Sequence, residues 1–143
     1  MYKKVLFATD FDEVGVRAAH KAKKIADENG ADLLLVHVVE PIPAYAYPGF
    51  AGFAEVEISI REQAEKELNA LAHQLGVDEN HCLLEFGSVK NEILRIADEH
   101  DIDLIVTGSH GKHGLGLLLG STANALLHAS HCDMLIVQPQ SKA

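Results

Sequence analysis

Basic residues are scarce in this chain. Its 143 residues include 12 lysines and arginines against 21 aspartates and glutamates, which gives a net charge of −9 at neutral pH. Duplex nucleic acid and anionic lipid surfaces both bind proteins through basic surface. We therefore expect neither a nucleic-acid partner nor a membrane-surface partner.

Long apolar runs and cysteines are also few. The longest apolar runs contain about five residues, whereas a membrane-spanning helix needs about 20. The apolar segment 5–8 is too short for a secretion signal. The two cysteines, Cys82 and Cys132, are too few for a disulfide framework. These features favour a cytoplasmic protein with two reduced thiols.

Short apolar segments alternate with amphipathic ones, and we interpret residues 1–143 as one domain. Because the strands are continuously apolar and alternate with helices, the sheet should be parallel and covered on both faces. The predicted fold is a doubly wound, open, parallel five-stranded α/β sheet with four helices, of Rossmann-like type. We expect strands at residues 3–9, 31–39, 81–86, 103–107 and 134–137, and helices at 13–29, 55–75, 89–97 and about 119–127.

Residues typical of helix ends flank the predicted helices. Asp12 and Ser88 stand where N-caps are expected, and Gly30 and Gly76 follow the last residues of two helices. The segment 40–53 shows neither the apolar spacing of a helix nor the apolar run of a strand. It holds three of the four prolines and four aromatic residues. It is longer than a usual strand-to-helix connection. The sequence leaves open whether this segment is a flap over a ligand or packs on the protein's own surface.

A glycine-rich segment between the fourth strand and the fourth helix carries the main functional signal. Five glycines lie from Gly108 to Gly120, and Ser121 and Thr122 follow at the expected helix start. Glycine lets the backbone approach a ligand closely, and a helix N-terminus suits a phosphate. An ordinary loop with a serine N-cap is the alternative. Neither a P-loop nor a dinucleotide fingerprint follows the first strand.

The chain resembles the universal stress protein family over its whole length. The resemblance rests on the segments 8–10 (ATD), 35–38 (LVHV), 107–111 (TGSHG), 120–124 (GSTAN) and 132–137 (CDMLIV). The ATP-binding branch of that family carries G-x2-G-x9-G-[ST]. This chain has Gly108-x2-Gly111-x8-Gly120-Ser121, so its loop is one residue shorter and must take a tighter path.

The resemblance implies a fold like that of the adenine nucleotide alpha hydrolases, and a site for ATP, or for ADP or AMP, with Mg²⁺ on the phosphates. Asp10 would contact the ribose or the adenine edge, and Val38 would meet adenine through its backbone. The glycines would line the ribose and phosphates. The implied cofactor-binding residues are Asp10, Val38, Gly108, Ser109, Gly111, Gly120, Ser121 and Thr122.

Other functional readings find less support. The nine histidines do not form a zinc pattern, and His37, inside the second strand, is interpreted as a core histidine with a satisfied hydrogen bond. No catalytic apparatus is recognisable. The sequence favours a cytoplasmic nucleotide-binding regulator of the stress response. A slow ATPase or autophosphorylating enzyme, and a dimeric interaction module without nucleotide, remain alternatives.

The last strand is predicted to join two copies of the chain. It follows the final helix and should lie at a sheet edge, and an unpaired apolar edge is an association site. The family resemblance likewise implies a homodimer with antiparallel pairing of the two last strands. The stress, the nucleotide preference and a further protein partner are not readable from the sequence.

Overall fold

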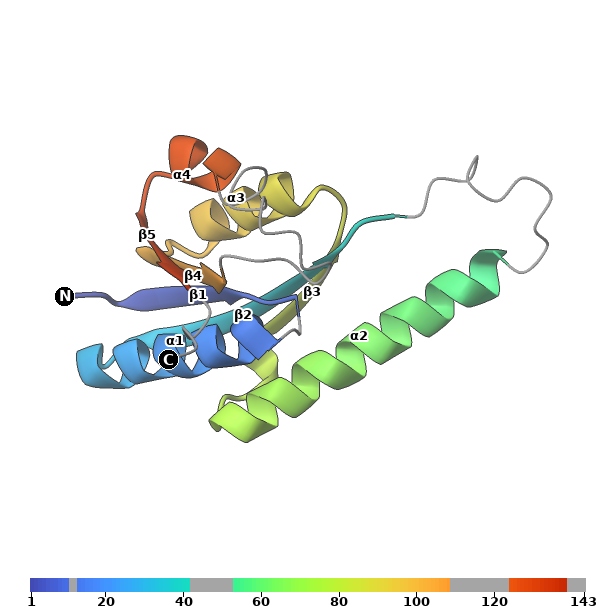
Figure 1. The fold of residues 1–143 in the computed structure, drawn as a ribbon, viewed down its shortest axis with the longest axis horizontal. Coiled ribbons are helices and arrows are strands. Elements are labelled where there is room, and N and C mark those ends of the chain that lie inside the picture. The colour runs from blue at the N-terminus through green and yellow to red at the C-terminus, as the bar shows by residue number, and fades with distance from the viewer. Residues whose placement is uncertain (11–12, 42–52, 109–123, 139–143) are drawn as a thin grey trace.

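The fold is a single parallel sheet with helices on both faces (Figure 1). The computed structural model describes residues 1–10, 13–41, 53–108 and 124–138. The strand order is β3-β2-β1-β4-β5, and every neighbouring pair is parallel. This confirms the predicted sheet. The strands are β1 (Lys4–Ala8), β2 (Asp32–Val39), β3 (Cys82–Phe86), β4 (Leu104–Gly108) and β5 (Asp133–Val137).

Two helices cover each face of the sheet, as the doubly wound pattern predicts. α1 and α2 pack on one face, and α3 and α4 on the other (Figure 1). A short 3₁₀ turn, η2, precedes β3. The helices are α1 (Glu13–Asn29), α2 (Phe53–Leu75), α3 (Val89–Glu99) and α4 (Asn124–Ala129), and η2 is Glu79–His81.

The residues expected at helix ends take those positions wherever the structure describes them. Gly30 and Gly76 follow α1 and α2 with φ of 64° and 71°, a backbone conformation that glycine adopts without strain. Ser88 caps α3, and its side-chain oxygen accepts a hydrogen bond from the Asn91 amide at 3.4 Å. Asp12, the expected cap of α1, lies outside the described residues.

Some boundaries differ from the sequence prediction by one or two residues. α2 begins at Phe53 rather than at residue 55. β3 begins at Cys82 rather than at 81, because the Asp78 side chain accepts from the Asn80 amide and holds the preceding residues in a 3₁₀ turn. β4 continues to Gly108, and α3 extends to Glu99, where an ion pair with Arg95 supports its last turn.

Two hydrophobic layers fill the space between the sheet and its helices. Phe7 and Leu35 face α1 and α2, while Leu6 and Ile105 face α3 and α4. All four side chains are fully buried. The first turns of α2 lie beyond this core, since residues 54–59 are exposed and the helix runs past the sheet in Figure 1. No helix in the described ranges is long and apolar enough to cross a membrane.

β3 and β5 form the two edges of the sheet, and the edge position of β5 agrees with the sequence prediction. The Asp133 amide donates to the Asp103 carbonyl at 3.3 Å, so the backbone groups of Asp133 point toward β4. Along a strand, the amide and carbonyl groups of successive residues point to opposite sides. The amide and carbonyl groups of Met134 and Ile136 therefore point away from the sheet, at an edge where no other described strand pairs with β5.

We predict that Gly76→Ala lowers the free energy of unfolding by about 1 kcal/mol, because alanine tolerates a positive φ poorly. A Cβ atom at Gly76 would meet nothing within 4 Å, so no steric clash contributes. Gly76→Asn is the matched control, since asparagine adopts this conformation more readily and should lose less stability. Urea unfolding of the three proteins measures both values. Equal losses for alanine and asparagine would contradict the conformational explanation.

Candidate functional site

The strand order reverses next to β1. From β1 the chain proceeds outward through β2 to β3, and then crosses to β4 and β5 on the other side of β1. In open α/β sheets, ligands bind beyond the carboxyl ends of the strands at such a reversal. Ala8, the last residue of β1, pairs with Val36 of β2 and Thr107 of β4. The candidate site is the region just beyond these pairs.

Three of the residues predicted from the sequence come together at this carboxyl edge. Asp10 lies two residues beyond the end of β1 and is exposed. Gly108 is the last residue of β4, on one side of β1. Val38 lies near the end of β2, on the other side, and its side chain is buried. Asp10 and Gly108 are brought to the same edge because β1 and β4 pair up to Ala8 and Thr107.

The other predicted residues fall outside the part of the chain that the structure describes. These are Ser109, Gly111, Gly120, Ser121 and Thr122, and the Pro- and aromatic-rich segment 42–52 is in the same position. The phosphate-binding half of the prediction, and the interpretation of 40–53 as a flap, therefore rest on sequence alone.

The backbone of Val38 points toward the candidate site. The Val36 carbonyl accepts from the Thr9 amide at 3.0 Å, and the Val39 carbonyl accepts from the Gly87 amide at 3.0 Å. Val36 thus points toward β1 and Val39 toward β3. By alternation the amide and carbonyl groups of Val38 point toward the β1 side, beyond the last paired residue of β1. This direction suits backbone recognition of a flat ring edge, while the apolar side chain remains in the core.

His37 is joined to the end of β1 by a hydrogen bond. Its Nδ1 atom lies 2.7 Å from the carbonyl oxygen of Thr9. The expected hydrogen bond of His37 is therefore confirmed, whereas the imidazole is half-buried rather than fully inside the core. Thr9 is buried and directly precedes Asp10. The sequence singled out neither Thr9 nor this bond, because the partners are 28 positions apart and no motif relates them.

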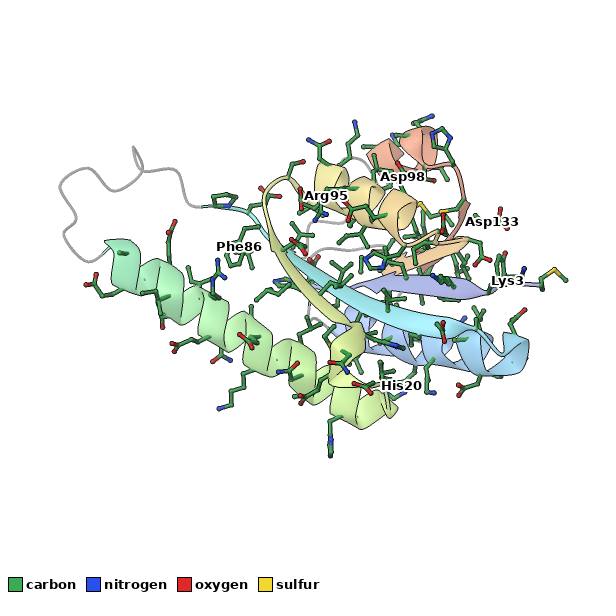
Figure 2. The ribbon with its side chains drawn as sticks, turned by 180° about the vertical axis from the view of Figure 1, so that it is seen from behind. Lys3, His20, Phe86, Arg95, Asp98 and Asp133 are labelled. Carbon is green, nitrogen blue, oxygen red and sulfur yellow. The ribbon has the colours of Figure 1, made fainter. Side chains whose placement is uncertain are left out.

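The opposite, amino edge of the sheet is closed by its own hydrogen bonds. The backbone amides of Lys3 and Lys4 donate to the Asp103 carboxylate at 2.8 and 3.0 Å. The Tyr2 hydroxyl donates to Asp133 at 2.8 Å, and this bond raises the pKa of the tyrosine. Lys3 and Asp133 lie together at this end in Figure 2.

Two arginines flank the carboxyl end of the edge strand β3. Arg61 of α2 lies over the Phe86 ring, 4.3 Å from its centre, on one face. Arg95 of α3 contacts Glu85 at 3.3 Å, and Figure 2 shows Arg95 and Phe86 at the same end of the molecule. Arg95 also pairs with two glutamates of its own helix. Arg95 thus lies among three carboxylates at this edge.

The surroundings of the two cysteine thiols keep them weakly nucleophilic. Partial burial, followed by nearby carboxylates, raises the pKa of both Cys82 and Cys132, which keeps these thiols protonated near neutral pH. A protonated thiol is a poor nucleophile. Within the described ranges, no group of three or more His, Cys, Asp and Glu residues is arranged to hold a metal ion.

A hollow of about 440 Å³ lies away from the candidate site, between α2, η2 and β3. Its walls carry both charge signs and the side-chain amides of Asn69 and Asn80, and no contact among them singles out a ligand. The lining residues are Arg61, Glu65, Leu68, Asn69, Glu79, Asn80, Cys82 and Leu84. The carboxyl edge is the stronger candidate because it lies at the strand reversal.

Solved structures with the same fold include proteins with a nucleotide bound. The chain superposes on the hypothetical protein MJ0577 with a TM-score of 0.82 and 27% identity, over 99% of each chain. It also matches a universal stress protein in complex with cAMP, with a TM-score of 0.64 and 27% identity, over 95% of this chain and 96% of the other.

Sequence comparison extends this similarity along the chain. Universal stress protein A homolog 2 of Coxiella burnetii is 42% identical over 139 residues, which cover 96% of this chain and 95% of the relative. Its homolog 1 from the same organism is 39% identical over 139 residues, covering 95% and 96%. The model of the universal stress protein family matches residues 1–138. On these matches, the chain belongs to the universal stress protein family.

Proposed function

We propose that residues 1–143 act as one domain that binds an adenine nucleotide at the carboxyl edge of the sheet and regulates the stress response without efficient turnover. Asp10, Val38 and Gly108, which come from three neighbouring strands, meet at the strand reversal, and this observation carries the proposal. The cAMP complex of a protein 27% identical to this chain supports the same ligand class.

Each of the three residues has a chemical role in this proposal. The exposed Asp10 carboxylate accepts hydrogen bonds from ribose hydroxyls or from the adenine amino group. The Val38 backbone pairs with the adenine edge. At Gly108 the absence of a side chain lets the ligand approach β4 closely. Ser109, Gly111, Gly120, Ser121 and Thr122 would hold the phosphates.

We propose ATP as the ligand, with ADP and AMP as alternatives, and Mg²⁺ on the phosphates. Mg²⁺ keeps several waters and is usually held by substrate phosphates with one or two carboxylates. The described residues of this edge fit that mode, because their exposed carboxylates, Asp10 and Glu40, do not form a cage of three or more ligands. Charge compensation by the ion would also favour phosphates beside a chain of net charge −9.

The half-buried, unpaired thiols of Cys82 and Cys132 suit the cytoplasm, which we propose as the location of the protein.

A dimeric interaction module is the second candidate function. The free edge of β5 favours it, because Met134, Leu135 and Ile136 are only half-buried there. Antiparallel pairing of two such edges would join two sheets into one and bury these apolar side chains.

We expect purified protein to release an adenine nucleotide on denaturation, or to bind added ATP in calorimetry. Asp10→Ala should weaken ATP binding about tenfold, or about 1.4 kcal/mol, since it removes a charged acceptor from the ribose or adenine end. Asp32→Ala is the matched control. Asp32 is also an exposed aspartate, but it lies at the amino end of β2 and should not affect affinity. Equal affinity of the two variants would contradict the role of Asp10.

Gly120→Val tests the phosphate half of the site. A valine side chain between the glycine motif and Ser121 should keep phosphate oxygens from the helix start and reduce ATP affinity at least about tenfold. Affinity for adenosine, which has no phosphate, should change much less. Parallel titrations with ATP and adenosine measure the difference. A folded variant with unchanged ATP affinity would overturn the assignment of phosphates to this segment.

Turnover assays separate this proposal from the enzymatic alternative. Release of phosphate or diphosphate from ATP, and incorporation of labelled phosphate into the protein, should both stay near the level of buffer. Sustained multiple turnover by the wild-type protein would instead favour an enzyme.

We predict that the wild-type protein is a dimer of twice 15.5 kDa in light scattering and that Ile136→Pro is a monomer. The Ile136 amide points out of the sheet, so proline there removes a donor from the free edge and spares the pairing with β4. Leu84→Pro is the matched control. The Gly87 amide points toward β2, so by alternation the Leu84 amide points away from β2, at the opposite edge of the sheet. The Leu84→Pro variant should therefore stay dimeric. A monomeric wild-type protein would overturn the dimer.

A further inference from the structure

The hydrogen bond between His37 and Thr9 determines the backbone direction at the candidate site. The Thr9 amide donates to Val36 at 3.0 Å, and the Thr9 carbonyl lies 2.7 Å from His37 Nδ1. Both backbone polar groups of Thr9 are thus held by β2. Thr9 is 5% exposed and His37 is half-buried, so the bond is partly shielded from water. Shielding strengthens a hydrogen bond relative to one at the surface.

The bond defines the tautomer of the imidazole. A carbonyl oxygen only accepts, so Nδ1 must carry the proton. In the neutral ring, Nε2 then carries none. The interaction therefore requires a proton on Nδ1, and this protonation has a spectroscopic signature that the protein itself reports.

Holding the Thr9 carbonyl also holds Asp10. The carbonyl of Thr9 and the amide of Asp10 belong to one planar peptide unit. Once the oxygen is held, this plane cannot rotate about the chain, and the Cα atom of Asp10 lies in the same plane. The imidazole thus limits the directions in which the Asp10 side chain can leave the end of β1.

We infer that His37 is a positioning residue, which presents the Asp10 carboxylate to the adenine nucleotide through the Thr9 peptide. The inference rests on the proposed function and adds to it the residue that preorganises the acceptor. Preorganisation matters because a carboxylate free to turn would lose conformational freedom on binding. His37 needs no contact with the nucleotide for this effect.

His81 provides a matched control within the same sheet. The Nδ1 atom of His81 lies 3.1 Å from the carbonyl oxygen of Leu33 in β2, and His81 is half-buried like His37. Both histidines thus bond a backbone carbonyl through Nδ1. The bond of His81 lies near the amino end of β2, away from the candidate site. Loss of either bond removes a histidine-to-carbonyl contact, but only the loss at His37 should affect the site.

The test is calorimetric titration with AMP and ATP of the wild type, His37→Leu, His37→Asn and His81→Leu. His37→Leu should weaken binding about fivefold, which corresponds to about 1 kcal/mol. His37→Asn should bind like the wild type, because its side-chain amide nitrogen stands the same number of bonds from Cβ as Nδ1 and also donates. His81→Leu should leave affinity unchanged. Wild-type affinity in folded His37→Leu, or equal weakening by His81→Leu, would overturn the inference.

A double-mutant cycle distinguishes positioning from a general structural role. If His37 acts through Asp10, then His37→Leu should have little further effect on affinity in an Asp10→Ala background. An undiminished effect there would overturn the inference and leave the nucleotide site in place. A wild-type protein that binds no adenine nucleotide would overturn the proposed function itself, and the inference with it.

Nitrogen-15 spectra of the wild-type imidazole supply a measurement that does not depend on the folding of a variant. The neutral His37 ring should be protonated at Nδ1. Protonation at Nε2 alone would overturn the inference, whatever the variants show.

Discussion

β1 is the strand on which the rest of this structure depends. It pairs in parallel with β2 on one side and with β4 on the other. Val5, Leu6 and Phe7 are fully buried, because helices cover both faces of the sheet at this point. The chain reverses its direction across the sheet beside β1, since it continues outward to β2 and β3 and then crosses to β4 and β5 on the other side. The candidate site lies beyond Ala8, at this reversal.

The amino and carboxyl ends of the sheet differ in whether the protein's own side chains satisfy the backbone groups there. At the amino end, the backbone amides of Lys3 and Lys4 are satisfied by Asp103, and Tyr2 is held by Asp133. This end is closed by the protein's own side chains. At the carboxyl end the strands stop in a region where Asp10 is exposed and the backbone of Val38 points toward β1. The exposed Asp10 side chain and the Val38 backbone make this end the candidate for ligand recognition.

Much of the architecture follows from local patterns in the sequence. The apolar period of residues 13–29 and Gly30 together define α1, whose observed bounds match the prediction. Gly76 and Ser88 act at helix ends for reasons of backbone geometry that hold in any fold. The boundaries that differed, such as the start of β3, depend on one local side-chain bond from Asp78 that competes with strand pairing. Such competition is decided by small energy differences, which a pattern does not resolve.

The sequence by itself determined the order of strands and helices, the glycine-rich connection after β4 and the family, because these depend on residue type and spacing. Only the tertiary structure decided which strands are neighbours, and thus that Asp10 and Gly108 share one edge. It also decided that His37 holds the carbonyl of Thr9, a contact between residues 28 positions apart. Periodicity reports which side of an element is buried, whereas a contact across the sheet also requires the strand order and the register, which arise when the whole core packs.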